Sequence, residues 1–370
     1  MQLRDLKRQY EALRPAMEEA LLAAAASGNY ILGEAVQDLE GRLARYVGVR
    51  HCVACASGTD ALRLALMACG VGRGDAVFVP DFTFFATAEA VALQGATPVF
   101  VDVERDTFNI SPDDLLRKIR QVEGDGRLRP RAVLAVDLFG RPADYAALRP
   151  IAHDHHILLL EDGAQAFGGS IGERRCCSFG DLAATSFFPA KPLGCYGDGG
   201  AVFTNDDGWA DVLRSLRVHG KGESKYHNVR LGLNSRLDAL QAAVLRVKMD
   251  AFEAHELAEA QRVAQAYTEA LGEAVACPLL PEGVRSAWAQ YTIRVEGRDD
   301  VQRALAAKGV PTAVYYPVPL HRQPAFGVDD RRADCPVATS LCGEVLSLPL
   351  HPYLTHEEQQ QVINAIKTIL

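Results

Sequence analysis

Apolar residues recur at helical spacing near the start of the chain. They lie three or four positions apart, at Leu3, Leu6, Tyr10, Leu13, Met17 and Leu21. This spacing predicts an amphipathic helix over residues 3–27, with Gly28 as its stop, and a second helix over 34–46. We expect residues 1–30 to form an N-terminal helical segment that packs with a small C-terminal domain.

From residue 52 onward, short apolar runs alternate with amphipathic helical stretches. The runs are Cys52–Cys55, Ala76–Val79, Pro98–Val101, Ala132–Asp137, Ile157–Glu161, Ala183–Phe187 and Ala201–Thr204. Continuous apolar runs of this length are typical of parallel strands that are buried on both faces, with crossover helices between them. The pattern predicts a doubly wound open sheet, in which ligands bind beyond the carboxyl ends of the strands.

The pattern changes again after residue 237. A long amphipathic stretch over 237–271 is followed by apolar segments at Trp288–Val295, Val301–Ala307 and Ala313–Tyr316, and by a final helix from Thr355. These segments predict a small α+β domain. We therefore divide the chain into 1–30, a large α/β domain over 31–250, and a small domain over 251–370.

Composition narrows the class of protein. The chain has 370 residues, 48% of them hydrophobic, and a formal charge of -8 that is spread without long blocks of one sign. This distribution argues against a nucleic-acid-binding surface. The first ten residues lack the apolar core of a signal peptide, and no apolar stretch reaches the roughly 18–20 residues of a membrane span. We therefore expect a cytoplasmic enzyme with no membrane partner.

Neither the cysteines nor the histidines predict a metal site. Nine cysteines in a chain of this size are typical of reduced, buried thiols. Cys52 and Cys55 form a CxxC pair without a second pair to complete a zinc site, so strand packing is the better interpretation. The histidines of the segment 153–156 precede a strand, and we interpret them as a solvated turn.

The loops that follow the predicted strands hold the candidate chemistry. Gly58 and Thr59 open a helix after the first sheet strand; they predict either an anion cradle or an ordinary capped helix start, and the residues fit both equally. Phe84 or Phe85, after the next strand, would stack on a flat heterocycle or simply pack against the helix start.

Asp162 follows the apolar run 157–160. A carboxylate at the end of such a strand needs a positive group or a hydrogen-bond donor, because burying it alone is too costly. A protonated pyridine nitrogen would satisfy Asp162. Gln165, one helical turn later, would then reach a phenolic oxygen on the same ring.

Ser186 and Lys191 lie between the sixth run and a glycine-rich loop. Ser186 is placed to bind a phosphate. Lys191 alone is consistent with an ordinary exposed lysine, but a lysine in a partly desolvated pocket has a depressed pKa and becomes a nucleophile. Taken together, the loops supply the groups that bind pyridoxal 5'-phosphate, a cofactor that needs a lysine and an acidic partner for its ring nitrogen.

Three motifs carry a family resemblance. Asp162-Gly-Ala-Gln165, Ser186-Phe-Phe-Pro-Ala-Lys191 with its glycine-rich loop, and Leu233-Asn234-Ser-Arg236-Leu-Asp238 resemble the DegT/DnrJ/EryC1/StrS nucleotide-sugar aminotransferases. The likeness extends from Asn29 to Pro352. It implies an α/β fold of the fold-type I class of pyridoxal-phosphate transferases. That fold has a large domain with a mainly parallel seven-stranded sheet flanked by helices, and a small α+β C-terminal domain.

The resemblance also implies the roles of individual residues. Lys191 and Asp162 would be catalytic, Lys191 as the internal aldimine and Asp162 as the partner of the ring nitrogen. The other cofactor-binding positions are Gly58, Thr59, Phe84, Gln165, Ser186 and Asn234, with Asn234 reaching the phosphate from the neighbouring subunit of a homodimer. Arg236, Tyr316 and His321 match positions that line the nucleotide-sugar pocket.

The resemblance implies amino transfer from L-glutamate to a keto sugar. The motifs 186–200 and Ala289-Gln-Tyr-Thr are most similar to enzymes that aminate C3 of a UDP-linked 2-acetamido-3-oxo-hexuronic acid for surface polysaccharide such as O-antigen. Arg236 or Arg230 would bind the uronate carboxylate. The alternative substrate is a 3-keto or 4-keto 6-deoxyhexose on a dTDP or UDP carrier.

Three other classes fit the sequence less well. The glycines at 70, 72 and 74 precede a strand, whereas a dinucleotide dehydrogenase needs them to open a helix after one. A dehydratase relative lacks the imine lysine. A catalytically idle regulatory protein of the same fold would have no need of the full set of cofactor residues.

Overall fold

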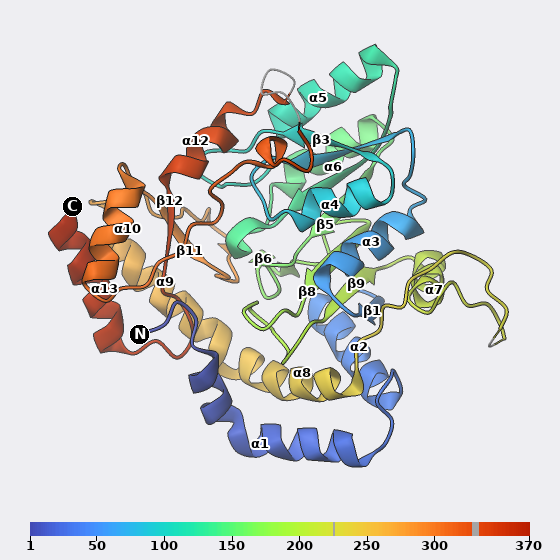
Figure 1. Ribbon diagram of the computed structural model, residues 1–370, viewed down its shortest axis with the longest axis horizontal. Helices are drawn as coiled ribbons and strands as arrows, with labels where there is room; N and C mark the ends of the chain where they lie inside the picture. The colour runs from blue at the N-terminus through green and yellow to red at the C-terminus, as the bar shows by residue number, and fades with distance from the viewer. Residues whose placement is uncertain (225, 328–332) are drawn as a thin grey trace.

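A seven-stranded sheet forms the centre of the molecule (Figure 1). The computed structural model describes residues 1–224, 226–327 and 333–370. The strand order is β1-β9-β8-β5-β4-β2-β3. The bounds are β1 His51–Cys55, β2 Asp75–Pro80, β3 Thr97–Val101, β4 Arg129–Val136, β5 Leu158–Asp162, β8 Leu182–Ser186 and β9 Gly200–Thr204. All seven predicted runs are therefore strands of one sheet.

One strand runs against the others. The pairs β2–β3, β2–β4, β4–β5 and β5–β8 are parallel, whereas β9 is antiparallel to both β8 and β1. The prediction that the run 201–204 is a parallel strand is thus wrong. The loop that joins β8 to β9 contains no crossover helix, and without a crossover the chain must return in the opposite direction.

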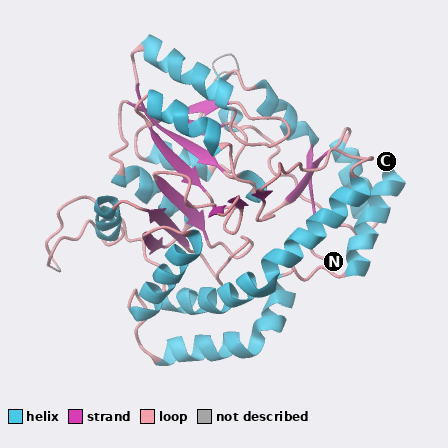
Figure 2. Cartoon of the chain, turned by 180° about the vertical axis from the view of Figure 1, so that it is seen from behind, coloured by secondary structure: helices cyan, strands magenta, loops and turns pink. Residues whose placement is uncertain are grey.

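Helices cover both faces of the sheet, as Figure 2 shows. Successive residues of a strand point to opposite faces, so Val53 and Cys55 join one apolar core while Cys52 and Ala54 join another. The first core contains residues of α3 (Gly58–Ala68), α4 (Ala86–Leu93) and α7 (Asp207–Leu216). The opposite face packs on α2 (Glu34–Val47), α8 (Ala239–Ala251), α5 (Pro112–Asp125) and α6 (Tyr145–Asp154).

A long helical path leaves the large domain. α8 continues through a π-helical turn, Phe252–Glu256, into α9, Leu257–Leu271, so the predicted helix over 237–271 is confirmed with a local irregularity. α9 packs with α10 (Arg298–Ala307) and α13 (His356–Ile369) around the antiparallel pair β11 (Tyr291–Arg294) and β12 (Val345–Leu348). Ala313 adds a single bridge to Ser347.

Short elements complete the fold. A small sheet has the order β10-β6-β7, with bounds Val284–Arg285, Ser170–Ile171 and Arg174–Arg175. The 3-10 turns η1 and η3 span Leu138–Gly140 and Leu320–Arg322, and α12 spans Pro336–Glu344. Within the part of the chain that the structure describes, no helix combines the length and apolar character needed to cross a bilayer.

The N-terminal segment contacts both parts of the molecule. α1 (Leu6–Ala26) lies along α8, as Figure 1 shows, and buries Met17 in the core on that face of the sheet. The residues before α1 instead meet the C-terminal segment, where the Leu350 amide donates to the Leu3 carbonyl at 3.3 Å. The segment thus packs against α8 as well as the small domain.

The cysteines and the histidine cluster have structural roles. The nine cysteines are free thiols, and Cys52 and Cys55 project to opposite faces of the sheet, which agrees with strand packing. His153 and His156 are exposed at the end of α6, as a solvated turn requires.

Candidate functional site

A cavity of about 440 Å³ opens at the carboxyl ends of β1, β5 and β8. Its volume is in the range typical of sites for small ligands. The reversed strand β9 brings its amino end, Gly200, to the same edge, where it pairs with Cys55 and Ser186. Eight of the predicted site residues line the cavity: Gly58, Thr59, Phe84, Asp162, Gln165, Ser186, Lys191 and Tyr316.

One wall of the cavity is the start of α3. Ser57 caps this helix, its Oγ accepting a hydrogen bond from the Asp60 amide at 3.1 Å. The free N–H groups of the first turn and the helix dipole favour an anion at this point. A Cβ atom on Gly58 would lie 2.6 Å from the Ser186 Cβ, so glycine is required for the close approach of α3 to β8.

Ser186 ends β8 beside this helix start. Its hydroxyl accepts a hydrogen bond from the Phe188 amide at 3.2 Å, and its residue is buried. The hydroxyl retains a proton to donate. The helix N-terminus and the Ser186 hydroxyl therefore form a cradle suited to a phosphate group.

Asp162 lies at the floor of the cavity and is 4% exposed. Its Oδ2 accepts a hydrogen bond from the Thr87 hydroxyl at 2.9 Å, and its Oδ1 accepts one from the Ala164 amide at 3.2 Å. Burial raises the pKa of Asp162, while these two donors and the charge of Lys191 act in the opposite direction. A cation next to Asp162 would favour the ionised carboxylate.

Lys191 lines the same cavity from the loop between β8 and β9. Its amide donates to the Phe188 carbonyl at 2.8 Å, which fixes a tight turn. Burial lowers the pKa of the Lys191 amine to about 8; Asp162 raises it, and Arg4 lowers it further. An amine with such a pKa is partly neutral near physiological pH and can act as a nucleophile.

Gln165 bridges two other segments. Its Oε1 accepts from the Phe139 amide at 2.7 Å, and its Nε2 donates to the Tyr316 hydroxyl at 3.0 Å. An amide nitrogen carries two donors. Gln165 is therefore held in the cavity wall by two hydrogen bonds. One N–H group of the side-chain amide that we predicted to reach a phenolic oxygen of a ligand ring donates to Tyr316 instead.

Aromatic rings form the outer wall. The rings of Phe84 and Tyr316 lie 6.2 Å apart at 39°, and Phe82 lies behind them, 6.1 Å from Tyr316. Phe84 is 54% exposed, although it is a large apolar side chain. An exposed ring at a cavity mouth is available to stack on a flat ligand.

Three predicted residues do not line the cavity. Asn234 and Arg236 lie at the base of an arm, residues 217–224 and 226–236, that projects beyond α7 at the right of Figure 1; Asn234 is exposed. His321 is buried, and its amide and Nδ1 are bonded to Asp81 at 2.8 and 2.6 Å. These contacts fix the turn of residues 320–322.

The cavity also contains residues that sequence reasoning missed. Thr87 binds Asp162, and Gln290, Tyr315 and Asp198 complete the lining. The Gln290 Oε1 atom is buried and has no hydrogen-bond partner within the described residues. Thr87 belongs to the first turn of α4, and its hydroxyl lies 3.3 Å from that of Thr83, but no pattern in the sequence links it to Asp162.

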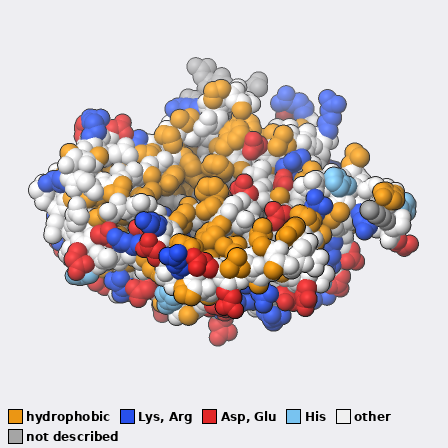
Figure 3. All heavy atoms as spheres, turned by 60° about the horizontal axis from the view of Figure 1, so that its bottom comes forward, with side chains coloured by type: hydrophobic (Ala, Val, Ile, Leu, Met, Phe, Trp, Pro, Cys, Tyr) orange, Lys and Arg blue, Asp and Glu red, His pale blue; other side chains and the backbone are white. Residues whose placement is uncertain are grey.

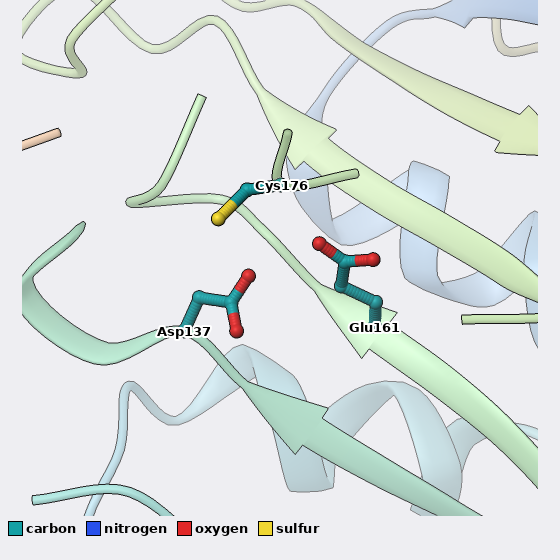
Figure 4. A group of neighbouring side chains, drawn as sticks. All are labelled: Asp137, Glu161 and Cys176. Atoms are coloured by element: carbon teal, nitrogen blue, oxygen red, sulfur yellow. The ribbon is translucent and has the colours of Figure 1, made fainter. Parts of the chain in front are cut away.

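Two acidic side chains and a cysteine form a second, buried cluster (Figure 4). Asp137, Glu161 and Cys176 have side-chain atoms within 4.8 Å of one another and are all buried. Glu161 accepts hydrogen bonds from the amides of Cys177, Phe179 at 2.6 Å and Gly180 at 3.1 Å. Burial raises the pKa of Glu161, whereas these three donors act in the opposite direction and favour its ionised form.

Asp137 carries the proton of this group. Its Oδ1 accepts from the Ala143 amide and the Tyr145 hydroxyl, while Oδ2 has no donor within the described residues. Burial, and then the charge of Glu161, raise the pKa of Asp137 well above its usual range. Two adjacent buried carboxyl groups cannot both ionise, so we assign a protonated Asp137 beside an ionised Glu161.

The cavity residues fit a pyridoxal phosphate molecule. The helix start and Ser186 suit its phosphate, Phe84 its ring face, and Asp162 its ring nitrogen, while Lys191 supplies an amine. Because Gly58 has no Cβ, the start of α3 can lie directly beside Ser186, which brings the helix N-terminus and the hydroxyl to one point.

Comparison with known sequences gives a consistent result. The profile of the DegT/DnrJ/EryC1/StrS aminotransferase family matches residues 12–367. A UDP-2-acetamido-2-deoxy-3-oxo-D-glucuronate aminotransferase of Pseudomonas aeruginosa is 46% identical over 95% of both chains. A pleiotropic regulatory protein of Geobacillus stearothermophilus is 42% identical over 98% of this chain and 96% of its own. A dTDP-3-amino-3,4,6-trideoxy-alpha-D-glucose transaminase of Streptomyces venezuelae is 39% identical over 98% and 94%.

Solved structures agree with these sequence matches. A DegT DnrJ EryC1 StrS aminotransferase from Brucella abortus has a TM-score of 0.97 and 48% identity, covering 100% of this chain and 99% of its own. NtdA from Bacillus subtilis, solved with bound cofactor PMP, has a TM-score of 0.85 and 28% identity over 97% and 82% of the two chains.

Proposed function

The chain belongs to the DegT/DnrJ/EryC1/StrS family of pyridoxal-phosphate-dependent nucleotide-sugar aminotransferases, and we propose that it transfers the amino group of L-glutamate to C3 of a UDP-linked 2-acetamido-3-oxo-hexuronic acid. The observation that carries the chemistry is the gathering of Lys191, Asp162, Ser186 and Gly58 in one cavity. Such a product would serve the synthesis of surface polysaccharide such as O-antigen.

Four kinds of contact would hold the cofactor. The first turn of α3, with Gly58 and Thr59, and the Ser186 hydroxyl would bind its phosphate. Phe84 would cover one ring face, and Asp162 would pair with the ring nitrogen. Bound there, pyridoxal phosphate supplies a carbonyl for amines and a ring that accepts electrons.

Lys191 moves the proton. Its amine is desolvated, with a pKa of about 8, so that it takes a proton from the Cα of the amino donor and returns one as a positioned base and acid. Thr87 and the Ala164 amide orient the Asp162 carboxylate, which keeps its negative charge toward the cavity. Gln165 and Tyr316 are joined by a hydrogen bond and would limit the space beside the cofactor ring.

The similarity to the Pseudomonas enzyme supports a UDP-linked uronic acid as the acceptor. A uronate carboxylate needs a cationic partner. Arg236 and Arg230 belong to the projecting arm and do not line the cavity of their own chain. We propose that Arg236 and Asn234 complete the cavity of a neighbouring subunit. Tyr316 contacts the sugar from within the chain, and His321 contributes through the turn that it fixes.

A homodimer with shared sites is part of this proposal. Tyr226 and Leu231 on the arm are 87% and 92% exposed. Figure 3 shows hydrophobic side chains gathered in a hollowed area of the face that comes forward in this view. Large apolar surfaces of this kind mark protein–protein contacts. Free thiols at all nine cysteines favour a reducing compartment, and we place the enzyme in the cytoplasm.

The lysine assignment has a matched control in Lys248. Burial lowers the pKa of Lys248 to about 8 as well, but this residue lies in α8 above the Tyr196 ring and does not line the cavity. Lys191→Ala is expected to lose the covalent link to the cofactor, its visible absorbance band and all turnover. Lys248→Met should retain the band. Loss of the band in Lys248→Met alone would show that the wrong lysine is assigned.

The acceptor is tested by competition between nucleotide sugars. The enzyme, converted to its amine-loaded form with glutamate, is mixed with the UDP-linked 3-oxo-uronic acid or with a dTDP-linked 3-keto 6-deoxyhexose. We expect return of the visible band at least tenfold faster with the UDP sugar. The Streptomyces relative makes the dTDP sugar the specific alternative, and a faster reaction with it would replace our assignment.

Shared sites are tested by mixing two inactive variants. A hybrid of Lys191→Ala and Asn234→Ala subunits contains one site with both native residues if Asn234 acts across the interface. Activity should therefore return when the two variants are refolded together. If Asn234 acts within its own chain, no hybrid site is intact and the mixture stays inactive.

A further inference from the structure

Residues 3–5, which precede α1, form hydrogen bonds on both sides of Arg4. The Leu3 carbonyl accepts from the Leu350 amide at 3.3 Å, and Asp5 caps α1 by accepting from the Arg8 amide at 3.0 Å. Arg8 also makes a bidentate ion pair with Glu358, at 2.6 and 2.9 Å. The backbone on either side of Arg4 is therefore fixed against the C-terminal segment.

From this fixed backbone, Arg4 reaches the loop that carries Lys191. Its Nη2 donates to the Lys191 carbonyl at 2.8 Å and lies 3.5 Å from the Pro192 carbonyl. On its other side, Lys191 is held by the hydrogen bond from its own amide to Phe188. The backbone of Lys191 is thus bonded in both directions, once within its loop and once to a residue 187 positions earlier in the chain.

The guanidinium of Arg4, a half-buried residue, brings a positive charge close to the loop of Lys191. Burial lowers the pKa of Arg4 to about 10, and Glu256 raises it, so the group stays charged at neutral pH. Glu256 is itself fixed by Gln9 at 2.9 Å and by the Tyr353 hydroxyl at 2.6 Å. The charge of Arg4 acts on Lys191 in the direction that favours a neutral amine.

We propose that Arg4 is a positioning residue for amino transfer, which acts through Lys191 by holding the backbone carbonyl from which the reactive amine projects. The inference rests on the proposed function, because it assumes that Lys191 is the cofactor lysine. It adds that the N-terminal segment, anchored on residues 350–358, belongs to the site although it does not line the cavity. Misplacing a reacting group by about 1 Å can cost roughly a hundredfold in rate.

The test compares Arg4→Met, Arg4→Lys and Arg8→Met. Arg4→Met keeps an unbranched side chain but loses the donor and the charge, so we expect kcat to fall by at least tenfold with little change in KM for glutamate. Arg4→Lys keeps the charge and one donor and should recover part of kcat. Arg8→Met loses the anchor to Glu358 without touching Lys191, and it controls for general loosening of the segment.

A second readout separates positioning from stability. In the full chain freed of cofactor, the pH dependence of acetylation at Lys191 is followed by mass spectrometry, together with thermal melting. Arg4→Met should move the labelling midpoint to higher pH, whereas Arg4→Lys and Arg8→Met should keep the wild-type midpoint. A midpoint and kcat in Arg4→Met that equal those of Arg8→Met would overturn the inference. If the wild type itself formed no link between cofactor and Lys191, the proposed function would fail first.

Discussion

Gly58→Ala tests the phosphate cradle most directly. Gly58 is in helical backbone, so alanine meets no conformational penalty there, and the whole effect comes from space. The new Cβ would lie 2.6 Å from the Ser186 Cβ and 2.9 Å from its Oγ. Carbon atoms pack best at about 3.5–4.0 Å, so the contact is roughly 1 Å too short. β8 is held between β5 and β9, and the start of α3 must therefore move.

We expect this movement to cost about 1–3 kcal/mol of folding stability, as overpacked cores do. Because the helix start also binds the phosphate, cofactor affinity should fall at least tenfold, which corresponds to about 1.4 kcal/mol. Urea unfolding measures the first quantity, and titration of the visible cofactor band measures the second. The reasoning would be refuted by a Gly58→Ala protein that binds the cofactor as tightly as the wild type.

Two further variants separate the effect on folding stability from the effect on cofactor binding. Gly41→Ala lies inside α2, where the new Cβ meets only the flexible end of Arg45 at 3.4 Å, so it should stabilise by about 0.5–1 kcal/mol and leave cofactor binding unchanged. The double variant Gly58→Ala/Ser186→Gly removes the colliding Cβ. It should recover part of the stability while cofactor binding stays weak, because the Ser186 hydroxyl is gone.

The remaining predictions concern the buried acids. Thr87→Val removes the donor to Asp162 and should lower kcat roughly tenfold or more, since hydrogen bonds to charged groups contribute about 1.5–3 kcal/mol; steady-state assays of Thr87→Val and Thr87→Ser check this, and equal rates in both would contradict it. Glu161→Gln leaves three amides without their carboxylate, so the free energy of unfolding measured with urea should fall by about 3 kcal/mol or more. Asp137→Asn should lower it much less, because the asparagine amide can donate to Glu161. Because the pKa of Asp137 is raised in the folded state, its stabilising contribution is fully present only below the unfolded pKa and is lost as pH rises. The free energy of unfolding of Asp137→Asn should therefore increase relative to that of the wild type as the pH rises above about 4, by up to about 1.4 kcal/mol per pH unit. A constant difference between the two proteins over that range would show that Asp137 is ionised.

Much of the fold follows from the pattern of apolar runs. Seven runs between residues 52 and 204 became the seven strands of one sheet, because each is short, apolar and followed by a break. The direction of β9 was not predicted correctly. A run of four apolar residues looks the same in either direction, and only the lack of a helix between 187 and 199 distinguishes the two cases.

The sequence predicts those site residues whose role can be inferred from a single loop after a strand. Seven of the eight predicted residues that line the cavity end or follow strands of the large sheet, because parallel strands end at the same edge; Tyr316 comes from a separate segment. Thr87 and Arg4 could not be found in this way, because their partners Asp162 and Lys191 are 75 and 187 positions away. A threonine on a helix face and an arginine before a helix have no local signature of such contacts.

The reversed direction of β9 bears on which segments of the chain could be exchanged to change the substrate. Ser186, Lys191 and Gly200 belong to a single hairpin that is clamped between β1 and β5, whereas Gln290, Tyr315 and Tyr316 come from segments that follow α9. Under the proposed function, the hairpin that handles the amino group and Tyr316, which would contact the acceptor, therefore come from separate parts of the chain. Exchange of residues 288–321 between relatives should change the contribution of Tyr316 to the choice of acceptor, while the hairpin and the proposed acceptor contacts of Arg236 and Arg230 stay intact.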